Sequence, residues 1–323
     1  MNAQTESYLK MIEYATKAPS GHNTQPWKFR VQDNFIEIIP DYSKTLTVVD
    51  TDNRELFISL GCATENLCIA ASTLGYMSQV DIRKDSVIVV HLNKSEIIKQ
   101  DSLFEQINKR QTNRSVYDYK HVDDNTLNKC IASIEPMENI SISKWENGSQ
   151  TYEQIKEYIL AGNTLQMNDK KFVDELKQWM RYNKKDSESQ KDGLSYAAFG
   201  APNLPAFISK PAMSSFLNSK KQNKGDTKKI ESSSHFILLS SKTDNITEWI
   251  ATGRYLERLL LRLTQEDIAH AYMNQPCEVT ELREELQKTM VPDQEYAQIL
   301  LRVGYAKPMP YSKRKEIKDV IVE

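Results

Sequence analysis

The chain carries its most distinctive segment at residues 18–27, which read Ala18-Pro19-Ser20-Gly21-His22-Asn23-Thr24-Gln25-Pro26-Trp27. Pro19 and Gly21 end a helix predicted over residues 8–18, and a strand is predicted over residues 27–30. Between them lies a loop of exposed backbone amides and side chains that donate and accept hydrogen bonds. Such a loop suits a flat polar heterocycle, because the main chain can approach closely at Gly21. The alternative is a polar turn whose side chains bond only to their own backbone.

A second segment, Arg110-Gln111-Thr112-Asn113-Arg114, places two arginines four residues apart with a hydroxyl between them. At a helix start or turn the two guanidinium groups would share one face and form a fork for a phosphate. The alternative is a solvated surface cluster. The run Lys313-Arg314-Lys315 follows a strand predicted over residues 299–305. It either adds positive charge to the same phosphate or forms an ordinary basic tail.

Four segments together resemble the nitroreductase family of FMN-dependent oxidoreductases. Residues 18–27 resemble the family's Ala-Pro-Ser-x-x-Asn-x-Gln-Pro-Trp signature, and residues 110–114 resemble its Arg-x-Ser-x-Arg, with Thr112 in place of Ser. Residues 61–76 resemble the central Gly-x-Ala-x-x-Asn-Leu-x-Leu-Ala-Ala-x-x-Leu-Gly helix. Arg302-Val303-Gly304-Tyr305, with Lys313-Arg314, resembles the C-terminal glycine strand and basic pair.

The order of these segments differs from that of common nitroreductases, where the arginine motif comes first. A predicted helix and strand at residues 54–76 and 87–92 are echoed at 250–272 and 297–305, with Gly61 and Gly253 in similar places. This arrangement resembles the single-chain, Acg-like branch, in which one polypeptide mimics the usual dimer. The resemblance implies an α+β, nitroreductase-like fold with two related halves, 1–105 and 106–323, each a β-sheet flanked by helices. A monomer is therefore expected.

The resemblance also implies which residues hold FMN. Ser20, Gly21 and Asn23 are expected to contact the ribityl chain or the ring, while Gln25 buttresses the loop. His22 occupies a variable position and either faces the flavin or caps the loop. The other implied contacts are Arg110, Thr112, Arg114 and Arg314, with Lys313, for the phosphate, and Met273 and Asn274 for the ring. No catalytic side chain is implied, since the flavin carries the chemistry.

The segment between the two halves contains more chain than the fold requires. An amphipathic helix is predicted over residues 172–182, a charged stretch follows at 184–191, and the lysine run at 220–224 is predicted to be an exposed loop. The Acg-like resemblance implies that an insert at about 184–226 covers the flavin as a lid. The alternative is a surface excursion, although long irregular segments inside compact domains usually have a function.

Composition narrows the class of protein. The chain has 323 residues, 39% hydrophobic and 27% charged, as expected of a globular enzyme. Its 42 basic and 44 acidic residues give a net charge of −2, so nothing indicates nucleic acid or an anionic membrane as a partner. No run of 18 apolar residues and no signal peptide is evident, and the four cysteines form no Cys-x-x-Cys. Buried thiols in a reducing cytoplasm are expected.

Other cofactor signatures are missing from the sequence. There is no Gly-x-Gly-x-x-Gly, no P-loop and no Gly-x-Ser-x-Gly. NAD(P)H is therefore expected to bind transiently over a flavin already in place. The five histidines show no His-Glu-x-x-His, so no metal is expected.

The resulting hypothesis is an FMN-dependent oxidoreductase that passes hydride from NAD(P)H through flavin N5 to a small-molecule acceptor. The acceptor would be a nitro-aromatic, a quinone or a similar flat molecule. The alternative is an FMN-binding or sequestering protein whose lid blocks turnover. A flavin-dependent dehalogenase or ring-fragmenting enzyme would share the scaffold, but no acceptor contacts for it are identifiable.

Overall fold

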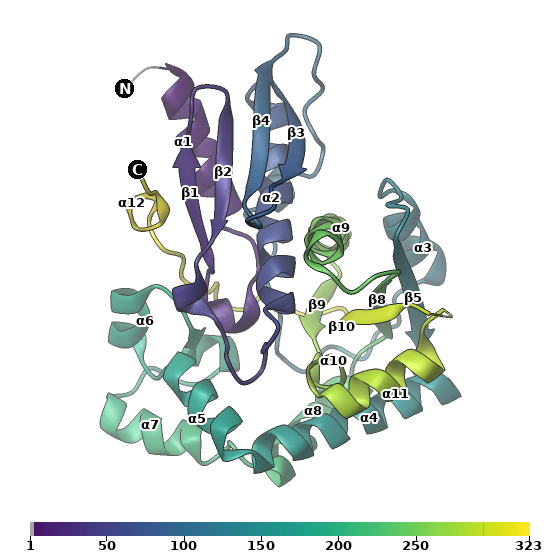
Figure 1. Ribbon diagram of the computed structural model, residues 1–323. Coiled ribbons are helices and arrows are strands. Elements are labelled where there is room, and N and C mark those ends of the chain that lie inside the picture. The colour runs from purple at the N-terminus through teal and green to yellow at the C-terminus, as the bar shows by residue number, and fades with distance from the viewer. Residues whose placement is uncertain (1–2, 293) are drawn as a thin grey trace.

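Two four-stranded antiparallel sheets, each packed on a long helix, form the centre of the protein in a computed structural model that describes residues 3–292 and 294–323 (Figure 1). The first sheet has the order β1 (Trp27–Val31), β2 (Phe35–Pro40), β4 (Ile88–Lys94), β3 (Tyr76–Ile82). Helices α1 (Ala3–Ala15) and α2 (Arg54–Thr73) pack on it and bury its apolar face. Three short 3-10 turns, Gly21–Asn23, Tyr42–Lys44 and Phe104–Gln106, lie in its connections.

The second sheet has the order β5 (Ile140–Glu146), β8 (His235–Ser241), β10 (Tyr296–Gly304), β9 (Ala269–Tyr272). All seven residues of β8 are buried because both of its faces are covered. Ile237 and Leu239 face α9 (Ile246–Gln265) and α3 (Asp124–Ala132), whereas Phe236 and Leu238 join the core of α4 (Gln150–Asn168), α10 (Gln275–Glu278) and α11 (Thr280–Met290). This alternation follows from the two-residue period of a strand.

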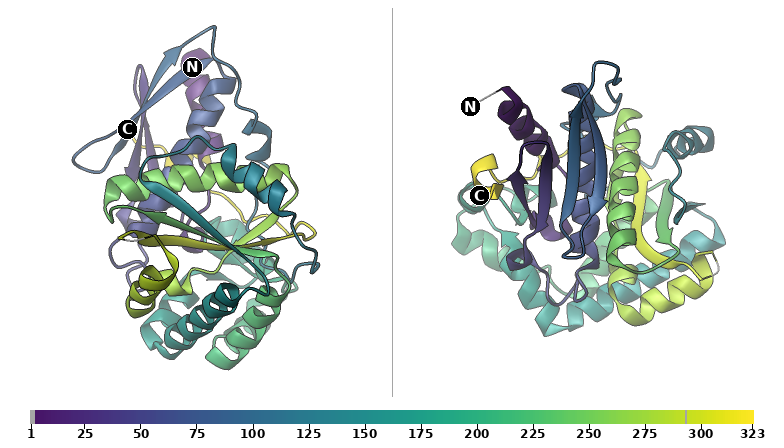
Figure 2. Two further views of the ribbon diagram at one scale, coloured as in Figure 1. Left: turned by 90° about the vertical axis from the view of Figure 1, so that its right-hand side faces the viewer. Right: turned by 45° about the horizontal axis from the view of Figure 1, so that its top comes forward.

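The halves meet where α2 and α9 cross, and the two views of Figure 2 show these helices side by side. The crossing is tight because each helix carries a glycine at the contact. A Cβ on Gly61 would lie 2.2 Å from the carbonyl oxygen of Ile250, and one on Gly253 would lie 2.0 Å from that of Ile58. The predicted α+β class with two sheet-and-helix halves is confirmed.

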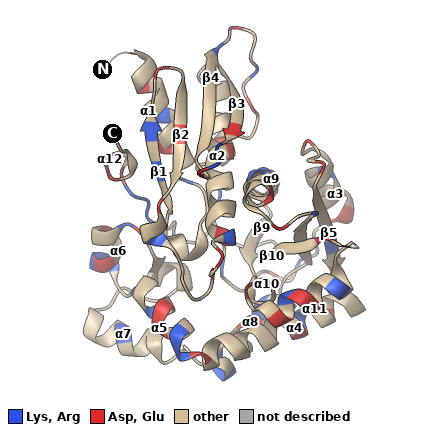
Figure 3. Ribbon diagram, viewed as in Figure 1, with Lys and Arg blue, Asp and Glu red and all other residues tan. Residues whose placement is uncertain are grey.

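A long excursion joins β5 to β8, which are neighbours in the second sheet. It contains α4, α5 (Lys170–Trp179), β6 (Met180–Arg181), α6 (Lys184–Gln190), β7 (Leu194–Ser195), a 3-10 turn (Tyr196–Phe199), α7 (Ala206–Ser214) and α8 (Ser219–Glu231). In Figure 1 these teal and green helices lie beneath both sheets. Figure 3 shows residues of both charge signs on α4, α5, α6 and α11 rather than one charged face.

The C-terminal segment returns to the first half. After β10 it passes along the excursion and ends at α12 (Ile317–Val320) beside β1, where the Val322 N–H donates to the Phe29 carbonyl at 2.9 Å. Residues from both ends of the numbering therefore share one region. One helix, α2, is long and apolar enough by composition to cross a membrane, but most of it is buried inside the fold.

Three local predictions were wrong. The helix predicted over 250–272 ends at Gln265, because Asp267 adopts a left-handed φ of 55° and the chain continues as β9. The lysine run at 220–224 lies in α8, whose start is capped by the Asn218 side chain, and not in a loop. Residues 110–114 are neither helix nor turn but extended, with Thr112 bridged to His270 of β9.

Candidate functional site

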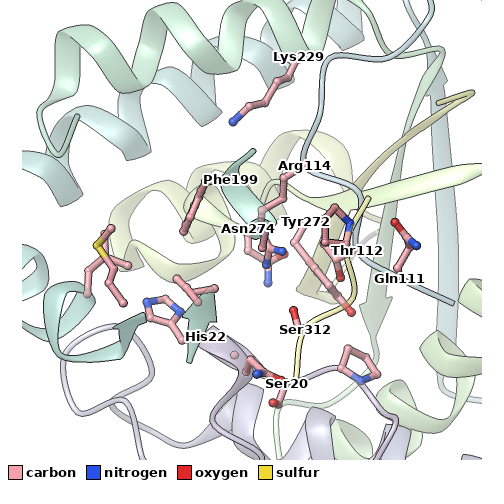
Figure 4. Close-up of a pocket in the computed structure, with 18 of the residues that line it drawn as sticks. Ser20, His22, Gln111, Thr112, Arg114, Phe199, Lys229, Tyr272, Asn274 and Ser312 are labelled. Atoms are coloured by element: carbon pink, nitrogen blue, oxygen red, sulfur yellow. The ribbon is translucent and has the colours of Figure 1, made fainter. Parts of the chain in front are cut away.

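A cavity of about 1080 Å³ lies where segments far apart in the sequence meet (Figure 4). Its walls come mostly from six parts of the chain: the loop at residues 17–23, the segment at 107–114, one face of α2, residues 272–278, the excursion, and residues 310–314. Both halves of the chain therefore contribute to this one cavity.

The loop at residues 20–25 is strained and held from outside the cavity. His22, Asn23 and Gln25 have φ values of 47°, 56° and 54°, a left-handed region that non-glycine residues rarely occupy. Gln25 donates from Nε2 to the Lys191 carbonyl at 2.8 Å and accepts from the Lys315 N–H at 2.8 Å. Gln25 is fully buried and does not line the cavity, so it buttresses the loop.

Asn23 lines the cavity, but its amide is also used for holding segments together. Its Nδ2 donates to the Gly193 carbonyl at 3.1 Å and to the Lys313 carbonyl at 3.2 Å, and its Oδ1 accepts from Arg314 Nη1 at 2.9 Å. Asn23 thus ties the loop to the excursion and to the C-terminal segment.

Arg110 and Arg314 form a buried cationic pair on the same carbonyl group. Arg110 donates to the Lys17 carbonyl at 2.7 Å, and Arg314 donates to it at 3.1 Å. Among the described residues, neither Nε atom has a hydrogen-bond partner, although Glu257 Oε1 lies 3.3 Å from that of Arg110. Burial first, and then Arg110, lowers the pKa of Arg314 to about 9. Only one carboxylate, that of Glu257, lies beside the two guanidinium groups of Arg110 and Arg314. The excess positive charge makes this a site that favours an anion.

Arg114 is a separate cation that points into the cavity (Figure 4). In an extended chain, residues 110, 112 and 114 share one side, which brings Thr112 into the cavity wall with both arginines. Within the described part of the chain, the Arg114 guanidinium makes no hydrogen bond or ion pair. Burial lowers its pKa, and Arg302 adds to that effect. The Arg114 guanidinium therefore offers hydrogen-bond donors to the cavity that no described protein group accepts.

His22 lies across the cavity from the arginine-bearing segment in Figure 4. Burial first, and then the charge of Arg114, lowers the pKa of His22 to about 4. Its imidazole is therefore neutral at physiological pH, and His22 adds a hydrogen-bonding group to the cavity without adding charge.

The remaining predicted residues divide in two. Ser20, Gly21 and Asn274 line the cavity, as does Lys313, whose side chain is half exposed near Glu188. Met273 does not line it: its side chain is 3% exposed and packs in the core between β8 and α4.

Several lining residues were not predicted. The face of α2 supplies Glu55, Ile58, Ser59 and Cys62, a spacing of three and four residues that marks one helix face. Tyr272 and Ser312 also line the cavity. Ser312 directly precedes the basic pair and was detectable on that ground. The excursion forms an apolar wall from Phe172, Leu176, Met180, Phe199, Met213 and Phe216.

A cluster of three carboxyl groups lies at the cavity wall, where Glu55 and Glu278 line the cavity and Asp50 lies outside the lining. Asp50 accepts the backbone N–H groups of Glu55 and Leu56 at 2.9 Å each, and so caps α2. Glu55 accepts from Asn274 Nδ2 at 2.9 Å, and Glu278 accepts from Gln166 at 2.6 Å. Burial, reinforced in Asp50 by Glu55 and in Glu55 by Glu278, raises the pKa of all three groups to about 7.

Glu55→Gln is expected to stabilise the protein more at pH 8 than at pH 5. Because the folded-state pKa is raised to about 7, the fold favours the protonated carboxyl, and stability is lost as pH rises from the unfolded pKa of about 4.3 through 7. Glutamine imitates the protonated form and should gain on the order of 1 kcal/mol at pH 8. The measurement is Tm against pH, with Glu96→Gln at an exposed position as control. Parallel wild-type and Glu55→Gln curves would contradict the shift.

Comparison with known proteins gives relatives over almost the whole chain. No family model matches. The chain is 23% identical to "Putative NAD(P)H nitroreductase Rv3131" of Mycobacterium tuberculosis strain H37Rv over 329 aligned positions, covering 98% of this chain and 91% of that protein. It is 26% identical over 77 residues to "Putative NAD(P)H nitroreductase acg" of the same strain, covering 24% of this chain and 23% of that protein.

Solved structures of nitroreductases are more distant. The FMN- and NADPH-dependent nitroreductase NfnB of Sphigopyxis sp. strain HMH is 14% identical, with a TM-score of 0.45, covering 69% of this chain and 99% of that one. NfnB of Mycobacterium smegmatis, solved in complex with NADPH, is 13% identical with a TM-score of 0.40, covering 62% and 86%. Over almost its whole length, the chain is therefore similar in sequence to proteins named as putative NAD(P)H nitroreductases.

Proposed function

We propose that this protein is a single-chain, FMN-dependent NAD(P)H oxidoreductase that reduces a nitro-aromatic, a quinone or a similar flat acceptor. The observation that carries the proposal is a set of guanidinium donors around one large cavity that lack an acceptor among the described residues. They are the Nε atoms of Arg110 and Arg314 and the whole guanidinium group of Arg114. A dianionic phosphate supplies the charge and the acceptor oxygens that Arg110 and Arg314 lack. The names of the sequence relatives support the same activity.

The residues present fit FMN at two ends. Arg110 and Arg314 would hold its phosphate, and Thr112 and Ser312, which line the same cavity, would add hydroxyl groups. Arg114, with neutral His22 and Asn274, would face the ring. When bound, FMN supplies hydride transfer.

The chain itself supplies orientation and charge in this proposal. Arg114 places a fixed positive charge in a buried cavity, where electrostatic interactions are stronger than in water. Such a charge stabilises negative charge that develops on a ring bound against it. The strained loop at residues 20–25 is fixed by Gln25 and Asn23, so its amides are positioned before any ligand arrives.

The size of the cavity favours turnover over sequestration. Single-ligand pockets usually occupy about 300–1000 Å³. This cavity measures about 1080 Å³, enough for a flavin and a second flat molecule. Phe199 and Phe216, which line it from the excursion, are 47% and 62% exposed, so the cavity reaches the surface. The excursion covers the cavity without filling it.

One reductive experiment separates the two functions. The FMN-loaded protein is mixed anaerobically with NADPH or NADH in a stopped-flow instrument, and the visible flavin band is followed. Bleaching within seconds is the expected result and supports the oxidoreductase. A yellow protein that keeps its colour supports the sequestering alternative. A colourless protein that cannot be reconstituted with FMN overturns both.

We also propose that one chain is sufficient for the site, with the halves at residues 1–105 and 106–323 in the place of two subunits. The convergence of the loop at 17–23 with Arg110 and Arg314 on one carbonyl group supports this proposal. All four cysteines are free and buried, which supports a cytoplasmic location. Light scattering of the FMN-loaded protein should give the mass of one chain.

A further inference from the structure

A group of metal-ligating side chains lies at the far end of the second sheet, away from the cavity lining. Asp124 in the first turn of α3, Glu146 at the end of β5 and His235 at the start of β8 place one ligand atom each within 4.8 Å of one another. Glu146 and His235 are paired in register on neighbouring antiparallel strands, so their side chains project from the same face. The register of the two strands therefore fixes the positions of Glu146 and His235 relative to each other.

The imidazole of His235 is buried and incompletely bonded. Its side chain is 0% exposed, and its Nδ1 lies 2.9 Å from Ser234 Oγ. Among the described residues, Nε2 has no hydrogen-bond partner, although it lies 3.4 Å from Asp124 Oδ1. A buried polar nitrogen without a partner is uncommon in folded proteins and calls for a ligand or an ion.

Two of the separations between ligand atoms match a tetrahedral site. Ligand atoms about 2.1 Å from a zinc ion at tetrahedral angles are separated by about 3.4 Å. His235 Nε2 and Asp124 Oδ1 are 3.4 Å apart, and His121 Nδ1 and Glu146 Oε1 are also 3.4 Å apart. The His121 side chain is half exposed and its ring lies 5.3 Å from that of His235. A small rotation of this exposed ring would bring its nitrogen to the other three.

We propose that Asp124, Glu146 and His235, with His121 as fourth ligand, bind a divalent transition-metal ion such as Zn²⁺. Imidazole and carboxylate together suit zinc, whereas calcium and magnesium prefer oxygen ligands alone. The contact of Ser234 with His235 Nδ1 would fix the ring orientation, as partners of metal-bound histidines do. The ion would tie α3 to β5 and β8.

The ammonium group of Lys144 competes with a metal ion for the Asp124 carboxylate. Lys144, two residues before Glu146 on the same face of β5, pairs with Asp124. Metal binding requires the ammonium to leave, and since its side chain is 24% exposed it can turn to solvent. The lysine therefore weakens the site without abolishing it.

The test is titration of the full-length, tag-free, chelator-treated protein with Zn²⁺ by calorimetry. We expect one ion per chain, and at least a tenfold loss of affinity in Asp124→Asn and in Glu146→Gln. Lys144→Met should bind more tightly than wild type. His91→Ala is the matched control, because His91 forms a similar pair with Asp81 at 3.2 Å on the other sheet; its affinity should be unchanged.

Thermal unfolding gives a second readout that depends on the same residues. Zn²⁺ should raise the Tm of the wild type and of His91→Ala but not of Asp124→Asn or Glu146→Gln, because only binding to the folded state stabilises it. No binding by the wild type, or equal binding by wild type, Asp124→Asn and Glu146→Gln, would overturn the site. Unchanged affinity in His121→Ala would overturn its role as fourth ligand. Circular dichroism shows whether each variant is folded.

Discussion

Arg114→Met is expected to weaken FMN binding on the order of 10- to 100-fold and to leave the flavin-free protein at least as stable as the wild type. Hydrogen bonds to charged groups contribute about 1.5–3 kcal/mol, and 1.4 kcal/mol is a factor of ten in affinity. The substitution leaves no protein acceptor unsatisfied, because Arg114 has no hydrogen bond or ion pair within the described residues. FMN titration and denaturant unfolding of the flavin-free protein measure the two effects.

Arg302→Met is the matched control for this prediction. Arg302 is also buried but lies outside the cavity lining, and it donates to the carbonyl groups of Asn113 and Ser115 at 3.1 and 2.8 Å. Its loss should cost several kcal/mol of stability, since buried acceptors are left unsatisfied at about 1–3 kcal/mol each. If Arg114→Met destabilised the protein as strongly as Arg302→Met and kept its FMN affinity, Arg114 would be a structural residue.

Gly253→Ala is expected to cost at least about 3 kcal/mol of stability or to prevent folding. The new Cβ would lie 2.0 Å from the Ile58 carbonyl oxygen, a backbone atom that can move only if the two helices separate. Because α2 supplies Glu55, Ser59 and Cys62 to the cavity, separation should also release FMN. Denaturant unfolding and flavin content of the purified variant give the two results.

Gly225→Ala, the same chemical change at another helical position, is expected to raise stability instead of lowering it. Gly225 lies inside α8, and a Cβ there would have nothing within 4 Å. Alanine at an open helical position should add about 0.5–1 kcal/mol of stability. If Gly253→Ala were tolerated as well as Gly225→Ala, the close crossing of the helices would not be a feature of the protein.

Helix-breaking residues and apolar runs in the sequence correctly predicted a helix end and two strands, because these elements depend on local residue properties. Pro19 and Gly21 do separate a helix from a strand, although the helix ends at Ala15. The strand predicted over 299–305 lies in β10 up to its last residue, Gly304. Helix α8 was not predicted because its mean hydropathy is low. It forms because Asn218 caps it and Ile230 packs on the core of α4.

The site was predicted in its residue types and less well in its geometry. Arg110, Thr112 and Arg114 do line one cavity, but through the two-residue period of an extended chain instead of the four-residue spacing of a helix. Asn23 was expected to contact the ligand, and Gln25 was expected from the family resemblance to buttress the loop. Their partners at Gly193 and Lys191 are 170 and 166 residues away, so no local pattern could show which segments these amides bind.

The shared carbonyl of Lys17 has a consequence for the order of folding. Its two donors, Arg110 and Arg314, are 93 and 297 residues away along the chain. Contacts between residues so far apart in sequence close large loops. We expect them to form late in folding, because the entropy cost of closing these loops must be met first. A ligand of this pair can recognise only the finished fold, so added FMN should slow unfolding without accelerating refolding. At 100 times its Kd it would add about 2.7 kcal/mol to the global free energy of unfolding. Unfolding of either half would then remove the site, because no smaller unit of the chain contains it.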